Sequence, residues 1–422
     1  MTSTPGYRSG QVHLLGLAGF SRNIGFGVNK VFAAALLQAL QASQPLIGFI
    51  LGLEGLLGIL MNPLTGWLSD RTRIPGLRRK VYVLICLPGA AVAWLLFAAS
   101  HSLVLAGLAL TLFYLFQQGS ISPYQAWMPE LVPVGLWGIA SGYLNLWWQL
   151  GNLVAFLVIP LVWSVSHGAA YLLVALLMTA GGLVTGFFVP ERPTLPSPEV
   201  AGFQAVGWKY TKLFRGNLLL YFLSQAFAWL SFEAIASFFT LFILHQAHGT
   251  VLDSALAMSL FTFTGLIAAL LSGGLYRRFS PKGLLALSLG LFGALALPGI
   301  AVHQMWAVFF LVGVEGVFWS ANLTVAFALA TDLLRQAAWN RQEEATMRGG
   351  LYGMGNVVQS IGLIVAAPTA GLVIRASGGN YGLMFLVASS ASFFGLICVL
   401  LMRPQRKIGG TMKADLQMET ES

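Results

Sequence analysis

Five charged side chains lie inside long apolar segments of this sequence, where ionisable groups are rare: Arg22, Lys30, Glu54, Glu233 and Glu315. A charge at the centre of a lipid bilayer costs at least about 2.5–3.5 kcal/mol on insertion scales, so each of these residues is a candidate for binding a solute or an ion. The alternatives are a permanent salt bridge and a long side chain that reaches the headgroup region.

Amides and indoles recur at helical spacing beside these charges. The residues are Asn29 next to Lys30; Glu315, Trp319 and Asn322 on one helical face; Gln225, Trp229 and Glu233 on another; and Asn145, Gln149 and Asn152 on a third. Carboxylates and amides can hydrogen-bond hydroxyl groups, and an indole can cover the apolar face of a sugar. The alternative is that these polar groups bond neighbouring helices.

The elements that carry these residues must cross a membrane. The chain of 422 residues is 57% hydrophobic and 9% charged, its mean hydropathy is +0.77, and soluble domains carry roughly 25% charged residues. A span needs about 20 apolar residues. The apolar segments predict twelve transmembrane helices, near 13–40, 46–68, 81–100, 103–123, 138–165, 169–189, 217–244, 254–276, 283–302, 305–330, 349–374 and 380–402.

The basic residues predict how these spans are oriented. If the N-terminus is cytoplasmic, twenty of the 23 Lys and Arg residues fall in cytoplasmic segments, as the positive-inside rule requires. Both termini are therefore predicted to be cytoplasmic. The predicted organisation is an N-terminal six-helix bundle over 1–189, a cytoplasmic linker over 190–215, a C-terminal six-helix bundle over 216–403 and a cytoplasmic tail over 404–422.

The two halves share an internal repeat. The loop after the second predicted span and the loop after the eighth place Gly and Arg residues at matching offsets, as in Gly66 to Arg71 and Gly273 to Arg278. The fifth and eleventh spans also agree, because Gly142, Asn145 and Gly151 have the spacing of Gly353, Asn356 and Gly362. Parallel repeats of six helices, with a solute path between them, are a standard transporter architecture.

The segment Gly66-Trp-Leu-Ser-Asp70-Arg71-Thr-Arg73-Ile-Pro-Gly76-Leu-Arg78-Arg79-Lys80 resembles the signature loop of the major facilitator superfamily. Asn62-Pro63 before this loop, and Glu130-Leu-Val followed by Ala140-Ser-Gly-Tyr143-Leu-Asn145, look most like the glycoside-pentoside-hexuronide cation symporters and the sucrose-type sugar transporters. The resemblance implies an all-α membrane protein of two pseudo-symmetric six-helix bundles.

The resemblance also implies roles for particular residues. Spans one, four, seven and ten would line a central cavity, where we predict that Arg22 pairs with Glu233 or Glu315 in one conformation and that protonation or solute breaks the pair. Asp70, with Arg71 or Arg79, would lock a cytoplasmic gate. Gly58 and Asn62 stand where melibiose-type symporters have the acids of a sodium site, so proton coupling, or no coupling, is favoured over sodium coupling.

The predicted function is secondary active transport of a small solute, a sugar or glycoside, coupled to protons, by a monomer in the cell membrane. The sequence contains none of the HExxH, GxSxG or GxxxxGK[ST] motifs, so an enzyme is not predicted. No metal, cofactor or nucleic acid is predicted as a partner. The alternatives are an exporter of drugs or amphiphiles, a carrier of an organic anion or lipid, and a non-transport assembly factor on the same fold.

Overall fold

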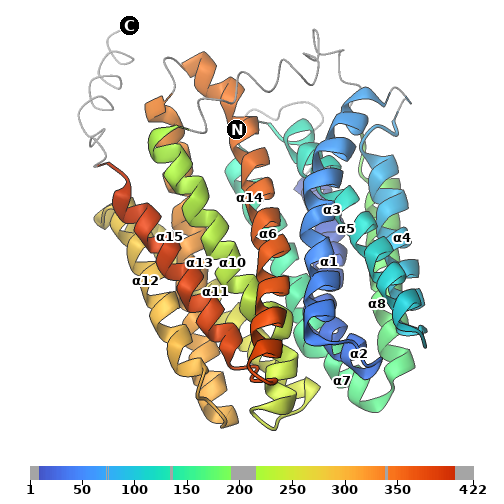
Figure 1. Ribbon diagram of the computed structural model, residues 1–422. Helices are drawn as coiled ribbons and strands as arrows, with labels where there is room; N and C mark the ends of the chain where they lie inside the picture. Colours follow the sequence, from blue (N-terminus) through green and yellow to red (C-terminus); the bar gives the residue numbers. More distant parts are fainter. Residues whose placement is uncertain are drawn as a thin grey trace, which may run out of the picture.

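The computed structural model describes residues 9–72, 74, 76–133, 136–191, 215–337 and 341–403, and long helices dominate this part of the chain (Figure 1). The helical elements of the first half are α1 (Ser9–Val28), η1 (Asn29–Ala33), α2 (Ala34–Ala39), α3 (Gln44–Arg71), α4 (Lys80–Ala98), α5 (Leu103–Leu131), α6 (Trp137–Leu153), η3 (Val154–Val158), α7 (Ile159–Val165) and α8 (His167–Phe188). Those of the second half are α10 (Gly216–His245), α11 (Val251–Arg278), α12 (Pro281–Gly299), α13 (Met305–Ala337), α14 (Arg341–Ala376) and α15 (Leu383–Leu401).

The helices have the length and composition of membrane spans. In the described part of the chain, eleven helices are long and apolar enough to cross a bilayer. The segment from Ser9 to Ala39, which runs through α1, η1 and α2, adds a further long helical path that carries Arg22 and Lys30. Large apolar side chains such as Phe49 and Leu108 are exposed on the outer surface, as expected where lipid is the solvent.

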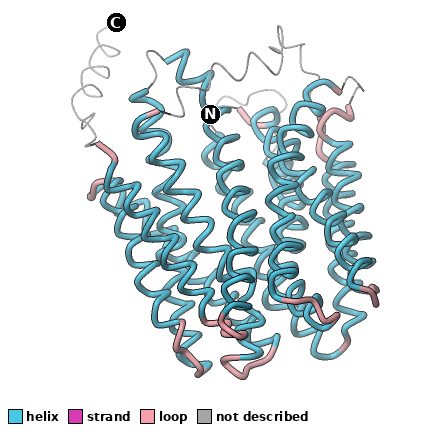
Figure 2. Tube along the Cα trace, viewed as in Figure 1, coloured by secondary structure: helices cyan, strands magenta, loops and turns pink. Residues whose placement is uncertain are grey.

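The connections between helices lie at the two ends of the bundle (Figure 2). We call the end where α1 begins and α15 ends the terminal end, and the opposite end the distal end (Figure 1). The distribution of Lys and Arg predicts that the terminal end faces the cytoplasm. The predicted linker and the C-terminal tail fall almost entirely on 192–214 and 404–422, which lie outside the described residues.

Each half packs its fifth span against its first through a glycine. Gly151 on α6 lies against the backbone of α1, where an added β-carbon would be 2.3 Å from the Phe20 carbonyl oxygen. Gly362 on α14 lies in the same way against α10, where an added β-carbon would be 2.9 Å from the Leu230 nitrogen. The repeat in the sequence therefore corresponds to two equivalent helix contacts, because glycine lets helix backbones approach closely.

The two halves meet along α3 and α14 through a line of glycines on α3. We call this line the glycine face; its members are Gly48, Gly52, Gly55 and Gly58. A β-carbon at Gly48 would lie 2.3 Å from the Ala367 carbonyl oxygen, and one at Gly55 would lie 2.4 Å from that of Ser360. The contact between the halves is therefore backbone against backbone over much of its length.

Candidate functional site

A buried lysine joins the two halves inside the bundle. Lys30 Nζ lies 2.6 Å from Glu233 Oε2 on α10 and 3.4 Å from Glu54 Oε2 on α3. The side chains of the three residues are 7%, 1% and 8% exposed, respectively. We call these residues the ion cluster. Because Glu54 belongs to the first half and Glu233 to the second, Lys30 connects the halves electrostatically.

The first half also holds the ion cluster through neutral hydrogen bonds. The Tyr114 hydroxyl on α5 donates to Asn29 Oδ1 at 2.9 Å, and Asn29 Nδ2 donates to Glu54 Oε2 at 3.3 Å. Asn29 and Lys30 begin the π-helical element η1, and such insertions are frequent at functional sites because they redirect side chains. The Phe26 ring lies 5.0 Å from Lys30 Nζ, at cation–π distance.

Glu315 lies inside the second half and does not face the ion cluster. It lines a cavity of about 20 Å³, which is also lined by Phe232 and Phe239 of α10, Phe261 of α11 and Phe292 of α12. Its Oε1 is buried and has no hydrogen-bond partner among the described residues. A charged carboxylate in such apolar surroundings is costly, so this position favours the neutral acid or a bound cation.

The predicted indole and amide face lies between α10 and α13. Trp229 and Trp319 contact each other edge to face with ring centroids 5.0 Å apart, and Trp319 stacks on Phe232 at 4.5 Å. The amides nearby have unused hydrogen-bonding capacity: within the described residues, Asn322 Nδ2 and Oδ1 and Gln225 Nε2 are buried without a partner. A buried amide without a partner costs free energy, which a solute with hydroxyl groups would recover.

Arg22 differs from Lys30 in its surroundings. Within the described part of the chain, Arg22 forms no ion pair, and its buried Nε has no hydrogen-bond partner. Its backbone oxygen accepts a hydrogen bond from Gln117 Nε2 at 3.4 Å. The structure thus pairs Glu233 with Lys30 and not with Arg22, the partner predicted for one conformation.

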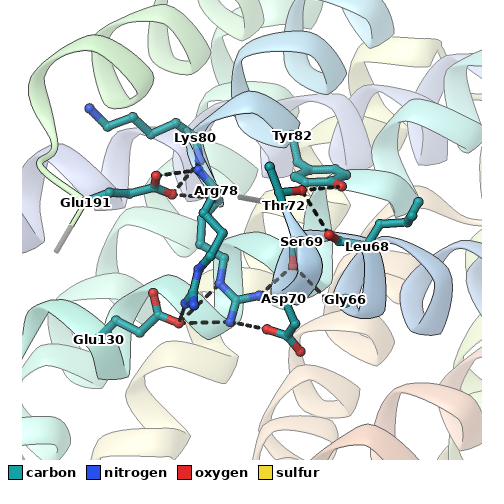
Figure 3. Close-up of polar contacts among 11 residues, drawn as sticks. Gly66, Leu68, Ser69, Asp70, Thr72, Arg78, Lys80, Tyr82, Glu130 and Glu191 are labelled. Atoms are coloured by element: carbon teal, nitrogen blue, oxygen red, sulfur yellow. Dashed lines mark hydrogen bonds and ion pairs between the residues drawn. The ribbon is translucent and has the colours of Figure 1, made fainter. Parts of the chain in front are cut away.

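A cluster of charges lies at the terminal end, between α3, α4 and α5 (Figure 3). Arg79 Nη2 lies 2.6 Å from Asp70 Oδ1 and 2.8 Å from Glu130 Oε1, while its Nη1 donates to Ser69 Oγ at 2.5 Å. Arg78 also contacts Glu130. The predicted partner of Asp70 was Arg71 or Arg79, and the structure selects Arg79. The guanidinium of Arg71 instead lies over the Trp67 ring at 4.2 Å.

Glu191, just beyond α8, holds the start of α4 in this cluster (Figure 3). Its carboxylate accepts hydrogen bonds from the backbone nitrogens of Arg78 at 2.5 Å, of Arg79, and of Lys80 at 2.9 Å. A carboxylate at a helix N-terminus satisfies free N–H groups and complements the helix dipole. The sixth span is thereby tied to the loop between the second and third spans.

At the distal end, four polar side chains connect the halves, and we call them the distal gate. Gln38 Nε2 on α2 donates to the Tyr381 hydroxyl at 2.7 Å, and Gln44 Nε2 on α3 donates to the same oxygen at 3.4 Å. Gln38 Oε1 lies 2.7 Å from His245 Nε2 at the end of α10. The imidazole of His245 stacks on the ring of Tyr381, with centroids 5.1 Å apart.

The structure therefore brings some predicted site residues together and separates others. Asn29, Lys30, Glu54 and Glu233 converge, whereas Glu315 occupies its own cavity. The sequence reasoning missed Tyr114, Glu191 and the distal gate. Glu191 could have been predicted, because an acidic residue directly after a span can pair with a basic loop at the same end of the bundle. Tyr114 could not, because a single tyrosine inside an apolar segment has no pattern that marks it.

Comparison with known proteins agrees with this architecture. The sequence matches the family model described as Major Facilitator Superfamily in two overlapping regions, residues 15–336 and 221–416. A bacterial homologue of the human lysosomal transporter Spinster, solved inward-facing and unoccupied, aligns with a TM-score of 0.68 at 16% identity, over 94% of this chain and 95% of that one. The nucleoside transporter NupG aligns with a TM-score of 0.74 at 14% identity, over 94% and 100%. No curated protein matches significantly in sequence.

The two bundles and the charged contact between them define a multi-pass membrane protein with a transporter fold. The chain belongs to the Major Facilitator Superfamily. The identity to the solved structures is low, so they establish the fold and not the solute.

Proposed function

We propose that this protein moves a small polyhydroxylated solute, a sugar or glycoside, across a membrane by alternating access and together with protons. The observation that carries the proposal is the contact of Lys30 with Glu54 of one half and Glu233 of the other. A buried ion pair between two rigid bodies stabilises the arrangement in which both partners meet. A ligand that competes for either partner therefore shifts the balance between arrangements.

The charges in the ion cluster give the proton a role. Lys30 supplies one positive charge, whereas Glu54 and Glu233 supply two carboxyl groups, and Glu233 Oε1 has no partner among the described residues. A proton on one carboxyl would make the cluster neutral while leaving one ion pair. Removing that proton, or offering a solute hydroxyl to Glu233, would change the attraction between the halves. Glu315 is a second candidate for the coupling proton, because its carboxyl has no counter-ion in its cavity.

The solute class is supported by the face next to Glu233. Gln225, Trp229 and Glu233 follow one another by four residues on α10, and Asn322 lies on α13, the helix whose Trp319 contacts Trp229. The unpartnered amides offer hydrogen bonds that a ring with several hydroxyls can satisfy. A nucleoside is itself a glycoside, so the fold shared with a nucleoside transporter is compatible with this class.

A second candidate, transport of an organic anion, is favoured by one observation. Arg22 has no ion pair in the described part of the chain, so its charge is available to a carboxylate or phosphate group. In either case, we propose that Arg79, Asp70 and Glu130 belong to a gate at the terminal end; their contacts lie within the first half, so the gate would close when this cluster meets the second half. We further propose that the terminal end is cytoplasmic, that the protein works as a monomer and that it resides in the cell membrane.

Uptake into proteoliposomes tests both candidates. Radiolabelled monosaccharides, disaccharides, nucleosides and dicarboxylates would be offered with and without an inward proton gradient. Gradient-stimulated uptake of a sugar or nucleoside that is lost in Glu233→Gln and Glu315→Gln, but kept in the control Asp253→Asn at the start of α11, would support the proposal. Uptake of the dicarboxylate alone, lost in Arg22→Gln, would favour the anion carrier. No uptake of any of these solutes by monodisperse protein would refute both.

A further inference from the structure

A polar cavity at the distal end is lined by three histidines. Its volume is about 300 Å³, and its walls are formed by His245, Gln246, His248, Ile300, His303, Gly379, Asn380 and Tyr381. We call it the histidine pocket. It is lined only by residues of the second half, and it shares His245 and Tyr381 with the distal gate. Its volume is at the lower limit of small-molecule sites, so a small polyatomic ligand would fit.

Hydrogen bonds within the protein determine which ring nitrogen of His303 and of His245 carries a proton. His303 Nδ1 lies 2.8 Å from the Ala301 carbonyl oxygen, which can only accept, so this nitrogen donates. His245 Nε2 lies 2.7 Å from Gln38 Oε1 and donates in the same way. His303 Nε2 and His245 Nδ1 therefore have no partner among the described residues, and neither does the ring of His248. A protonated imidazole carries N–H groups on both nitrogens, so each ring would then gain a free donor.

The other groups around the pocket favour an anion. The pocket has no carboxylate in its lining, and in the described part of the chain no three His, Cys, Asp or Glu side chains are placed to hold one metal ion. Two charged residues lie on the elements packed around the pocket. Asp253 of α11 accepts hydrogen bonds from the Thr250 nitrogen and hydroxyl, and Arg375 lies in the last turn of α14. Protonation adds a positive charge to an imidazole, so acidification makes the lining positive.

We propose that the histidine pocket binds a small oxyanion when its imidazoles are protonated, and that the bound anion stabilises the closed distal gate. The link is His245, because its protonation leaves the Nε2–H bond to Gln38 intact and makes it charge-assisted, while Nδ1–H turns to the anion. The imidazolium also lies against the face of the Tyr381 ring, where a cation is attracted. By reciprocity, closing the gate tightens anion binding by the same factor.

Sulfate is the probe for this proposal, because its charge is the same at pH 5.5 and pH 8. Binding to full-length protein in nanodiscs would be measured as the rise in Tm on sulfate titration at constant ionic strength. The variant is His248→Asn with His303→Gln, since asparagine tolerates the φ of 54° at His248. His101→Gln, which changes an exposed histidine at the distal end of the first half, is the matched control.

We expect sulfate to raise the Tm saturably at pH 5.5 and not at pH 8, with the same result in His101→Gln. In the double variant the apparent affinity for sulfate should fall about 100-fold, because each charged donor contributes about tenfold. Spin labels at Gln41→Cys and Ser377→Cys, one on each half at the distal end, should report a shift towards the short distance with sulfate at pH 5.5. Equal stabilisation at both pH values, equal affinity in the double variant, or an unchanged distance distribution would overturn the proposal. This readout involves no transport, so its failure is distinct from failure of the proposed function.

Discussion

Replacing Lys30 with methionine tests the ion cluster as the contact that holds the halves together. The substitution keeps an unbranched side chain only one atom shorter and removes its charge, which leaves Glu54 and Glu233 buried without a cation. In the structure Lys30 Nζ lies 3.4 and 2.6 Å from these carboxylates. Removing one member of a buried ion pair costs about 3–5 kcal/mol, and this cost applies to the conformation in which the three residues meet, the one with the distal gate closed.

At 1.4 kcal/mol per factor of ten, a cost of about 3–5 kcal/mol changes the ratio of closed to open distal gates by about two to three and a half orders of magnitude. The assay is pulsed electron paramagnetic resonance, which measures the distance between spin labels at positions 41 and 377. We expect the main population in Lys30→Met to move to the longer distance. Lys282→Met is the matched control, because among the described residues Lys282 donates only to the carbonyl oxygens of Leu400 and Met402, at one end of the second half. An unchanged distance distribution in Lys30→Met would refute the assigned role, as would the same shift in the control.

Three further predictions concern packing and the terminal end. Gly151→Ala places a β-carbon 2.3 Å from the Phe20 carbonyl oxygen and should lower the free energy of unfolding by about 1–3 kcal/mol. The control Gly142→Ala meets nothing within 4 Å and should leave stability unchanged, so equal Tm values for the two variants would contradict the prediction. Glu191→Gln weakens the acceptor at the start of α4, so a loss of about 1 kcal/mol is expected in thermal unfolding, and a wild-type Tm would argue against it. Arg79→Lys keeps the charge but loses the fork that binds three acceptors, so initial uptake should fall at least about tenfold; full uptake would show that charge alone suffices.

The sequence predicted the fold because hydropathy reports which residues lie in lipid. Several helix ends were predicted less well, because hydropathy marks the boundary of the lipid and not the end of the helix. The second span was expected over 46–68 and the helix is Gln44–Arg71; the eleventh was expected from 349 and the helix starts at Arg341. Backbone hydrogen bonding continues past the apolar region into residues such as Arg71, which water can solvate, so helix ends and lipid boundaries are different quantities.

The candidate site was predictable as a set of residues but not as an arrangement. Lys30 and Glu233 stood out because charges in apolar segments are costly, yet they are 203 residues apart and no local pattern pairs them. The π-helical turn at Asn29 redirects Lys30 by an amount that a regular helical period does not give. Trp229 and Trp319 were predicted to cover a sugar; the contact between their rings depends on how α10 and α13 pack, which no local pattern in the sequence reveals.

The glycine face of α3 has a kinetic consequence. Helices that interlock through side-chain ridges must break that interdigitation, or change rotamers, before one can tilt on the other. At Gly48 and Gly55 the surface of α3 is bare backbone against the carbonyl oxygens of α14, so a change of tilt there displaces no side chain. The activation enthalpy for rocking one half on the other is therefore set by the polar contacts that join the halves, at the distal gate and at Lys30, more than by side-chain packing between α3 and α14.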